Sequence, residues 1–269
     1  MSVDLVPDAG LMQDEIDERR RRSQARFDAI LSGAAKPPEI HYTREPLSAV
    51  EALVADSPVS PVVVSFHTTA YFLLMGVLAS GTMQCSAIVN ESIAKRMAGV
   101  ADRTLNKVNF HTGLTPGVIR SMRAGQRLLF IMGDVFLPYG ANAPLPFRDR
   151  ALRYTISWAD LAFRNRLPVV LCVLKDRGDQ ADVHIEFLPD TCASPYHLAF
   201  EAFRRFDRCL GKDDHLWENY PAMARFGRLL PPIGTQVTPQ LIREIGRLSM
   251  CDEKLAHSVR SWLNENRPC

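Results

Sequence analysis

The sequence predicts an α/β fold: a largely parallel central sheet covered by helices, followed by a helical C-terminal part. From residue 61 onward, short apolar runs alternate with segments of helical periodicity, as in chains whose parallel strands are joined by helices. The length of 269 residues, with 46% hydrophobic and 23% charged residues, suits one globular domain. From residue 197 onward the patterns are helical.

The first expected element is a charged helix over residues 11–32. Acidic residues precede four consecutive arginines at 19–22, the order that the helix dipole prefers. A glycine ends this helix and a Pro-Pro pair begins a linker, so we expect residues 1–36 to form a separate charged helix and residues 37–269 a single domain. Either this helix lies on the domain with its arginines facing solvent, as most charge runs do, or the arginines contact an acidic partner.

The remaining elements follow from the alternation of apolar runs and helical patterns. The expected strands are residues 62–66, 83–89, 126–131, 168–174 and 183–188. The expected helices are residues 69–79, 91–101, 116–124, 149–165, 197–209, 213–226, 238–247 and 251–264. We expect the strand at 183–188 to be an antiparallel partner of the strand before it, because a short turn containing Gly178 connects them.

Composition argues against several classes of function. A net charge of +2 gives no reason to expect nucleic acid or an anionic membrane as a partner. The six cysteines are scattered, and no Gly-x-Gly-x-x-Gly, Gly-x-Ser-x-Gly or His-Glu-x-x-His motif occurs, so we expect neither a metal nor a cofactor. The N-terminus does not resemble a signal peptide, and no apolar run has the length of a membrane span. We therefore expect a cytoplasmic chain with reduced thiols, with peripheral membrane contact left open.

His67 is the candidate catalytic residue. It ends the buried strand at 62–66, and the carboxyl edge of a parallel sheet is where open α/β folds place their ligands. A histidine there is suited to act as a general base, although many strand-end histidines are only structural. Asp134 ends another apolar strand on the same expected edge, where it either caps a turn or belongs to the site.

Further candidates for substrate contacts are Thr68, Thr69, Tyr71, Phe72, Arg103, His111 and Arg148. The two threonines could instead cap the following helix. Phe72 and the apolar residues after it either line an acyl pocket or belong to the core. The arginines are candidates for binding an oxyanion or a phosphate, and His111 has loop flanks that could face the same cleft.

The order of segments resembles the lysophospholipid acyltransferase superfamily, and within it the lipid A late acyltransferases, which transfer lauroyl and myristoyl groups. The resemblance covers residues 61–226. It comprises the strand ending in His67, the helix, glycine turn and strand leading to Asp134, the Leu-Pro-Phe turn at 145–147, the helix and proline-led strand at 155–174, and the tryptophan-containing segment at 215–226.

The resemblance implies transfer of an acyl group from an activated donor, with His67 as general base. In this family an acidic residue stands five positions after the histidine, and here that position is Phe72. Asp134 is the best substitute for that acid, ahead of Glu91 and Asp149. The family branch also carries an N-terminal membrane anchor, where this chain has the charged helix. The resemblance therefore favours a diffusible, small-molecule acceptor.

Two functions follow as expectations. The first is an acyltransferase that moves an acyl group from coenzyme A, an acyl carrier protein or an aminoacyl-tRNA to a hydroxyl or amine. The arginines at 19–22 would suit these anionic donors. The second is a catalytically inactive family member that binds an acyl ligand or a carrier protein. A carboxylate within hydrogen-bonding distance of the His67 ring favours the enzyme, and a ring packed only against apolar neighbours favours the inactive protein.

Overall fold

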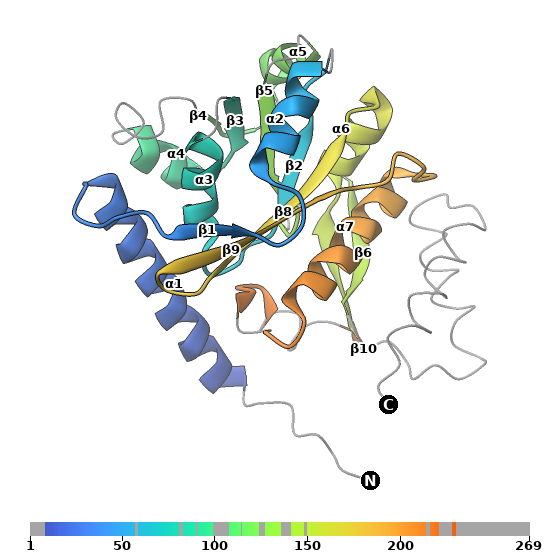
Figure 1. The fold of residues 1–269 in the computed structure, drawn as a ribbon. Helices are drawn as coiled ribbons and strands as arrows, with labels where there is room; N and C mark the ends of the chain where they lie inside the picture. Colours follow the sequence, from blue (N-terminus) through green and yellow to red (C-terminus); the bar gives the residue numbers. More distant parts are fainter. Residues whose placement is uncertain are drawn as a thin grey trace.

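A seven-stranded mixed sheet forms the centre of the structure (Figure 1). The computed structural model describes residues 9–56, 59–80, 83–89, 91–98, 108–113, 115–123, 127–135, 141–147, 150–213, 216–220 and 228–229. The strand order is β1 (Glu39–Tyr42), β9 (Gln180–Phe187), β8 (Val169–Asp176), β2 (Val62–Ser65), β5 (Arg127–Met132), β3 (Gln84–Ile88) and β4 (Val108–His111). Neighbouring strands are parallel except β8 and β9, the pair expected to be antiparallel. The α/β class and the mostly parallel sheet are thus confirmed.

A second, antiparallel sheet lies beside the first, in the order β10 (Arg228–Leu229), β7 (Arg150–Thr155) and β6 (Asn142–Phe147). The single helix expected over residues 149–165 is therefore wrong in its first part. Residues 150–155 pair along their whole length with β6, and this pairing overrides the helix-forming residues in the segment. The helix begins only at Ser157.

The described helices are α1 (Ala9–Leu31), α2 (Leu47–Asp56), α3 (Tyr71–Ser80), α4 (Glu91–Ala98), α5 (Pro116–Arg123), α6 (Ser157–Asn165) and α7 (Pro195–Leu210). None of them is both long and apolar enough to cross a membrane. Two other expectations fail. Residues 39–42 form edge strand β1 rather than a linker. Within the helix expected at 213–226, Trp217 forms a β-bridge and residues 218–219 form a turn, whereas Tyr220 is helical. The helices expected at 238–247 and 251–264 lie outside the described residues.

The two faces of the sheet carry two separate apolar cores. In β2, Val62 and Val64 point to the face covered by α5, α6, α7 and the small sheet, whereas Val63 points to the face covered by α1, α2 and α3 (Figure 1). Every β2 residue is buried, as expected for a central parallel strand covered on both sides. The strand that leads to His67 is therefore fixed from both faces.

Helix α1 is charged, but it is also part of the fold. Ile16, Ser23 and Phe27 are buried along one side of it, at spacings that return to the same helical face. The Phe27 ring stacks on Phe72 of α3, with 5.9 Å between the ring centroids. Arg26 pairs with Asp176 at the end of β8 at 2.7 Å. Helix α1 therefore lies on the domain, one of the two arrangements expected from the sequence. The arginines at 19, 21 and 22 are paired with glutamates of α1 itself.

Candidate functional site

His67 and Asp134 meet because their strands are parallel and adjacent. Ser65 of β2 is the register partner of Met132 of β5, and each of the two candidate residues lies two positions further on. Between them, the Gly133 backbone N–H donates to the Ser65 carbonyl at 2.7 Å. A Cβ on Gly133 would lie 2.8 Å from a methyl group of Val64, closer than packed atoms tolerate. Glycine therefore permits the close approach that brings the carboxylate to the imidazole.

The His67 ring donates from Nδ1 to Oδ1 of Asp134 at 2.8 Å. The backbone N–H of His67 also donates to Oδ2 at 3.0 Å. Nδ1 is thus held by the carboxylate, and Nε2 is the nitrogen left to exchange a proton with a bound molecule. A carboxylate that fixes the tautomer and orientation of an imidazole in this way is the arrangement used by histidine general bases.

Asp134 is held by further donors. Its side chain is fully buried, and Oδ2 accepts the indole N–H of Trp217 at 2.7 Å and the amide of Asn219 at 2.9 Å. The same Asn219 amide donates to the Asp134 backbone carbonyl at 3.0 Å. A buried carboxylate with this many donors remains ionised and well fixed.

Two opposing effects set the pKa values of His67 and Asp134: burial, and the attraction between the two side chains. Burial on its own would lower the pKa of His67, but the charge of Asp134 and the hydrogen bond to it outweigh burial and raise the pKa above the ordinary 6.5. Burial would likewise raise the pKa of Asp134, but the His67 charge and the donors around it hold this pKa below its ordinary value. His67 is therefore a stronger base than a free imidazole.

Both residues line a cavity of about 880 Å³. Its walls are mainly apolar and include Met75 of α3, Ile88 at the end of β3 and Ile93 of α4. The cavity is large enough for a drug-sized organic molecule. His67 is 25% exposed, whereas Asp134 is fully buried behind it. The imidazole is thus the member of the pair that a ligand can contact.

Two polar atoms on cavity-lining residues have no hydrogen-bond partner among the described residues. They are the indole N–H of Trp158 and the Oε1 atom of Glu218, and both atoms are buried. Buried donors and acceptors are normally paired, so those that are not need an explanation. One donor and one acceptor beside a cavity are suited to a ligand that carries the complementary groups.

The residues predicted to contact substrate are placed differently from one another. Tyr71 lines the cavity, with its ring 5.3 Å from the His67 ring, edge to face. Thr68 and Thr69 are buried, and the Thr68 hydroxyl donates to the backbone carbonyl of Leu174 at 3.1 Å. A structural role therefore accounts for Thr68, and neither threonine is among the residues that line the cavity.

Phe72 and His111 are not among the residues that line the cavity. Phe72 is buried against Phe27, in the core between α1 and α3. His111 ends β4, and burial together with Arg127 lowers its pKa. The prediction that these two residues contact the substrate is not supported by this placement. Arg103 and Arg148 lie outside the described residues.

Several residues of the site were not predicted as site residues, among them Trp217, Glu218 and Asn219. They follow one another in a segment that was expected to be helical. The segment is held against His67 by two backbone contacts, from the Glu218 N–H to the His67 carbonyl at 2.8 Å and from the Thr69 N–H to the Leu216 carbonyl at 2.8 Å. The sequence signal for them is the Trp-Glu-Asn run itself, three residue types that donate or accept hydrogen bonds.

Comparison of the sequence with protein-family models gives no match, and comparison with curated proteins gives none either. Within the described part of the chain, no group of three or more histidine, cysteine, aspartate or glutamate side chains is arranged to hold a metal ion. The case for a function therefore rests on the geometry around His67.

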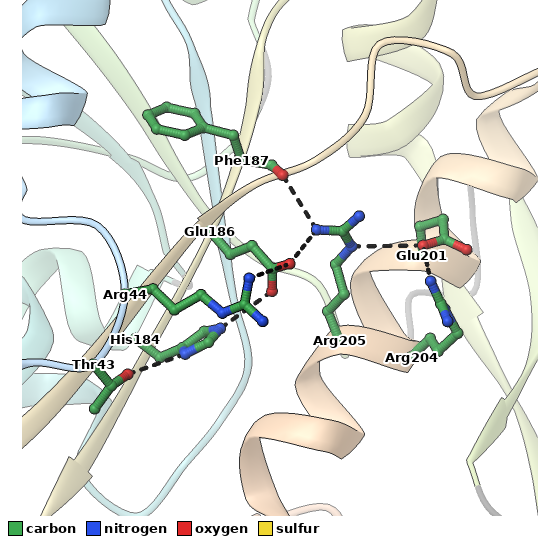
Figure 2. A network of polar contacts seen from close by, with 8 residues as sticks. All are labelled: Thr43, Arg44, His184, Glu186, Phe187, Glu201, Arg204 and Arg205. Atoms are coloured by element: carbon green, nitrogen blue, oxygen red, sulfur yellow. Dashed lines mark hydrogen bonds and ion pairs between the residues drawn. The ribbon is translucent and has the colours of Figure 1, made fainter. Parts of the chain in front are cut away.

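A second cavity, of about 350 Å³, lies between β9 and α7 and is lined largely by charged side chains. Figure 2 shows the polar network at this place. Glu186 accepts from Arg205 and from His184 at 3.2 Å, and it lies 3.5 Å from Arg44. Arg205 also lies 3.5 Å from Glu201. Arg205 of α7 thus contacts Glu186 of β9 as well as Glu201 of its own helix, so the network joins α7 to the sheet.

Replacing Glu186 with glutamine should destabilise the fold by about 3 kcal/mol, because it leaves Arg205 and Arg44 short of a buried counter-charge. Burial on its own would raise the pKa of Glu186. His184, Arg205 and Arg44 outweigh burial, so the pKa of Glu186 lies below its ordinary value. The stabilisation by Glu186 is therefore present above the unfolded-state pKa and is lost as the pH falls through the folded-state pKa.

Urea unfolding at neutral and at acidic pH measures both effects of the Glu186→Gln substitution. Glu15→Gln is the matched control, since Glu15 forms an exposed pair with Arg19 within one helix and should contribute about 0.5 kcal/mol or less. Equal stability losses for the two variants would show that the network does not join α7 to the sheet.

Proposed function

We propose that this chain is an acyltransferase in which His67, oriented by Asp134, is the general base. The observation that carries the proposal is the 2.8 Å contact between His67 Nδ1 and Asp134 Oδ1, placed at the carboxyl ends of β2 and β5 and beside a cavity of about 880 Å³. The resemblance to the lysophospholipid acyltransferases supports the choice of reaction. Asp134 supplies, from a neighbouring strand, the carboxylate that Phe72 does not provide.

In the proposed reaction, the acceptor hydroxyl or amine attacks the carbonyl carbon of the donor while Nε2 of His67 removes its proton. The new C–O or C–N bond gives a tetrahedral intermediate, which collapses by breaking the bond to the thiolate or alkoxide of the donor. The proton on Nε2 passes to that leaving group. Asp134 stays ionised throughout and stabilises the imidazolium formed in the first step.

The negative charge that develops on the carbonyl oxygen needs a hydrogen-bond donor. The Trp158 indole N–H, on a residue that lines the cavity, has no acceptor among the described residues. Ser157 lines the same cavity, and its oxygen accepts from the Ala141 N–H at 3.3 Å, so that within the described residues its hydroxyl proton is left for a ligand. We assign these two groups to the oxyanion, where removing one donor typically costs two to three orders of magnitude in rate.

The second function, binding of an acyl ligand or carrier protein without turnover, predicts a His67 ring packed only against apolar neighbours. The 2.8 Å contact with the ionised Asp134 favours the enzyme instead. An apolar cavity wall suits an acyl chain in either case.

The proposal is tested by offering the chain three classes of activated donor: an acyl-coenzyme A, an acylated carrier protein and an aminoacyl-tRNA. Each is combined with a panel of small alcohols and amines, and the products are detected by mass. We expect one donor class to give an ester or amide at a rate above that of the buffer. Binding of acyl chains without product from any donor class would favour the inactive function.

A further inference from the structure

Glu218 is an ionisable residue of the cavity that the proposed transfer does not use. Its backbone N–H donates to the His67 carbonyl at 2.8 Å, so its position is tied to that of the base. Its side chain is 13% exposed and lines the cavity. The Oε1 atom is buried and has no hydrogen-bond partner in the described part of the chain.

The arginine beside Glu218 does not satisfy its carboxylate. Arg20 of α1 approaches Oε2 only to 3.9 Å, beyond hydrogen-bonding distance, and the arginine side chain is 56% exposed. Burial raises the pKa of Glu218 to about 7, against the lowering effects of Arg20 and His67. A carboxyl group in this setting gains most from a ligand that brings a positive charge and a donor to Oε1.

The charge of the cavity points the same way. The described residues that line the cavity include three with carboxylates: Glu91, Asp134 and Glu218. No lysine or arginine is among the described lining residues. The Asp134 carboxylate is fully buried behind His67 and takes its hydrogen bonds from His67, Trp217 and Asn219, whereas Glu91 is exposed and paired with Lys95 at 2.8 Å. Glu218 is therefore the carboxylate of the cavity whose side chain is left for a ligand. A neutral alcohol would leave Glu218 without a counter-charge, whereas an ammonium group would supply one.

We propose that the acceptor is an amine, which binds as its ammonium ion to Glu218 and is acylated there to an amide. The inference rests on the proposed acyl transfer and names the class of its acceptor.

The proton balance of this reaction needs two bases, and the site has both. The ammonium ion gives one proton to the Glu218 carboxylate and becomes nucleophilic. The neutral amine attacks the carbonyl carbon, and His67 Nε2 takes the second proton as the C–N bond forms. Collapse of the intermediate breaks the C–S or C–O bond of the donor, and His67 returns its proton to the departing thiolate or alkoxide. Glu218 then releases its proton to water.

The inference is tested with n-hexylammonium and n-hexanol as probes of equal chain length. Isothermal titration calorimetry gives the Kd of each probe for the wild-type chain and for Glu218→Gln. We expect the wild type to bind the ammonium more tightly than the alcohol, and Glu218→Gln to weaken ammonium binding by roughly tenfold or more with little effect on the alcohol. Glu91→Gln, which removes the exposed carboxylate of the same cavity, should change the ammonium Kd by less than about twofold, in line with weak surface charge interactions.

A second arm separates this inference from the proposed transfer. Product formation from one activated donor is measured with each probe as acceptor. Ammonium binding that depends on Glu218, without any product, would support the cation site and overturn the transfer. Transfer that depends on His67 but is equal for amine and alcohol and unaffected by Glu218→Gln would overturn the amine inference and leave the transfer standing. Failure of the wild type to bind n-hexylammonium also overturns the inference.

Discussion

Replacing Asp134 with asparagine is expected to lower the transfer rate by about four orders of magnitude, the loss seen when a serine-protease triad loses its orienting carboxylate. Asparagine has the same size, but its amide cannot both accept the His67 Nδ1–H and hold the charge of the imidazolium. It also places a donor among the donors of Trp217 and Asn219. The single-turnover rate with a thioester donor measures the effect.

The same Asp134→Asn substitution should lower the stability of the fold, because buried donors lose an ionised acceptor at a typical cost of about 1 to 3 kcal/mol. Asp160→Asn is the matched control, since Asp160 forms an exposed pair with Arg164 within α6. It should leave both rate and stability close to those of the wild type. An Asp134→Asn variant that transfers within tenfold of the wild-type rate would show that Asp134 does not orient the base.

Replacing His67 with glutamine is expected to lower the transfer rate by about two to four orders of magnitude, the usual contribution of a general base. Glutamine keeps polar atoms near Asp134 but cannot accept a proton at neutral pH. Because the ring is partly exposed, we expect the folded structure to persist, which circular dichroism would verify.

His41→Gln provides the control for His67, since the His41 side chain is 70% exposed and lies on the edge strand β1. It should transfer at the wild-type rate. If His67→Gln and His41→Gln transferred equally well, the base would have to be another group.

The central part of the site could be predicted from sequence because it depends on local patterns. Each of the two apolar runs ends in a polar residue, His67 and Asp134, and the carboxyl ends of parallel strands lie at one edge. Their contact was not predictable with certainty, since it requires β2 and β5 to be neighbours in one particular register. Gly133 is the residue that permits the approach, and its role appears only once the Val64 side chain is in place.

The rest of the site depends on contacts between segments that are distant in sequence. The spacing of apolar residues along the chain does not predict such contacts. Trp217, Glu218 and Asn219 were assigned to a helix, because the surrounding residues have helical propensity. In the folded chain they form a turn whose backbone bonds to that of His67. The strands β6 and β7 were missed for a similar reason, since each is stabilised by the other and by the aromatic core beneath them.

The carboxylate that orients His67 could come from either of two positions, residue 72 or residue 134. An acid five residues after the histidine would have to come from the first turn of α3. Here that position packs against Phe27 of α1 and belongs to the core. The carboxylate comes instead from the end of β5, where Trp217 and Asn219 fix it.

The most direct test of the central claim is the pH dependence of single-turnover transfer by the wild type and by Asp134→Asn. A general base acts only when it is unprotonated, so the wild-type rate should fall as the pH drops through the folded-state pKa of His67, which lies above 6.5 because of Asp134. In Asp134→Asn the residual activity should fall at a lower pH, because the charge that raises this pKa is gone. A rate that does not change with pH, or a midpoint that is the same in both proteins, would contradict a His67 base coupled to Asp134.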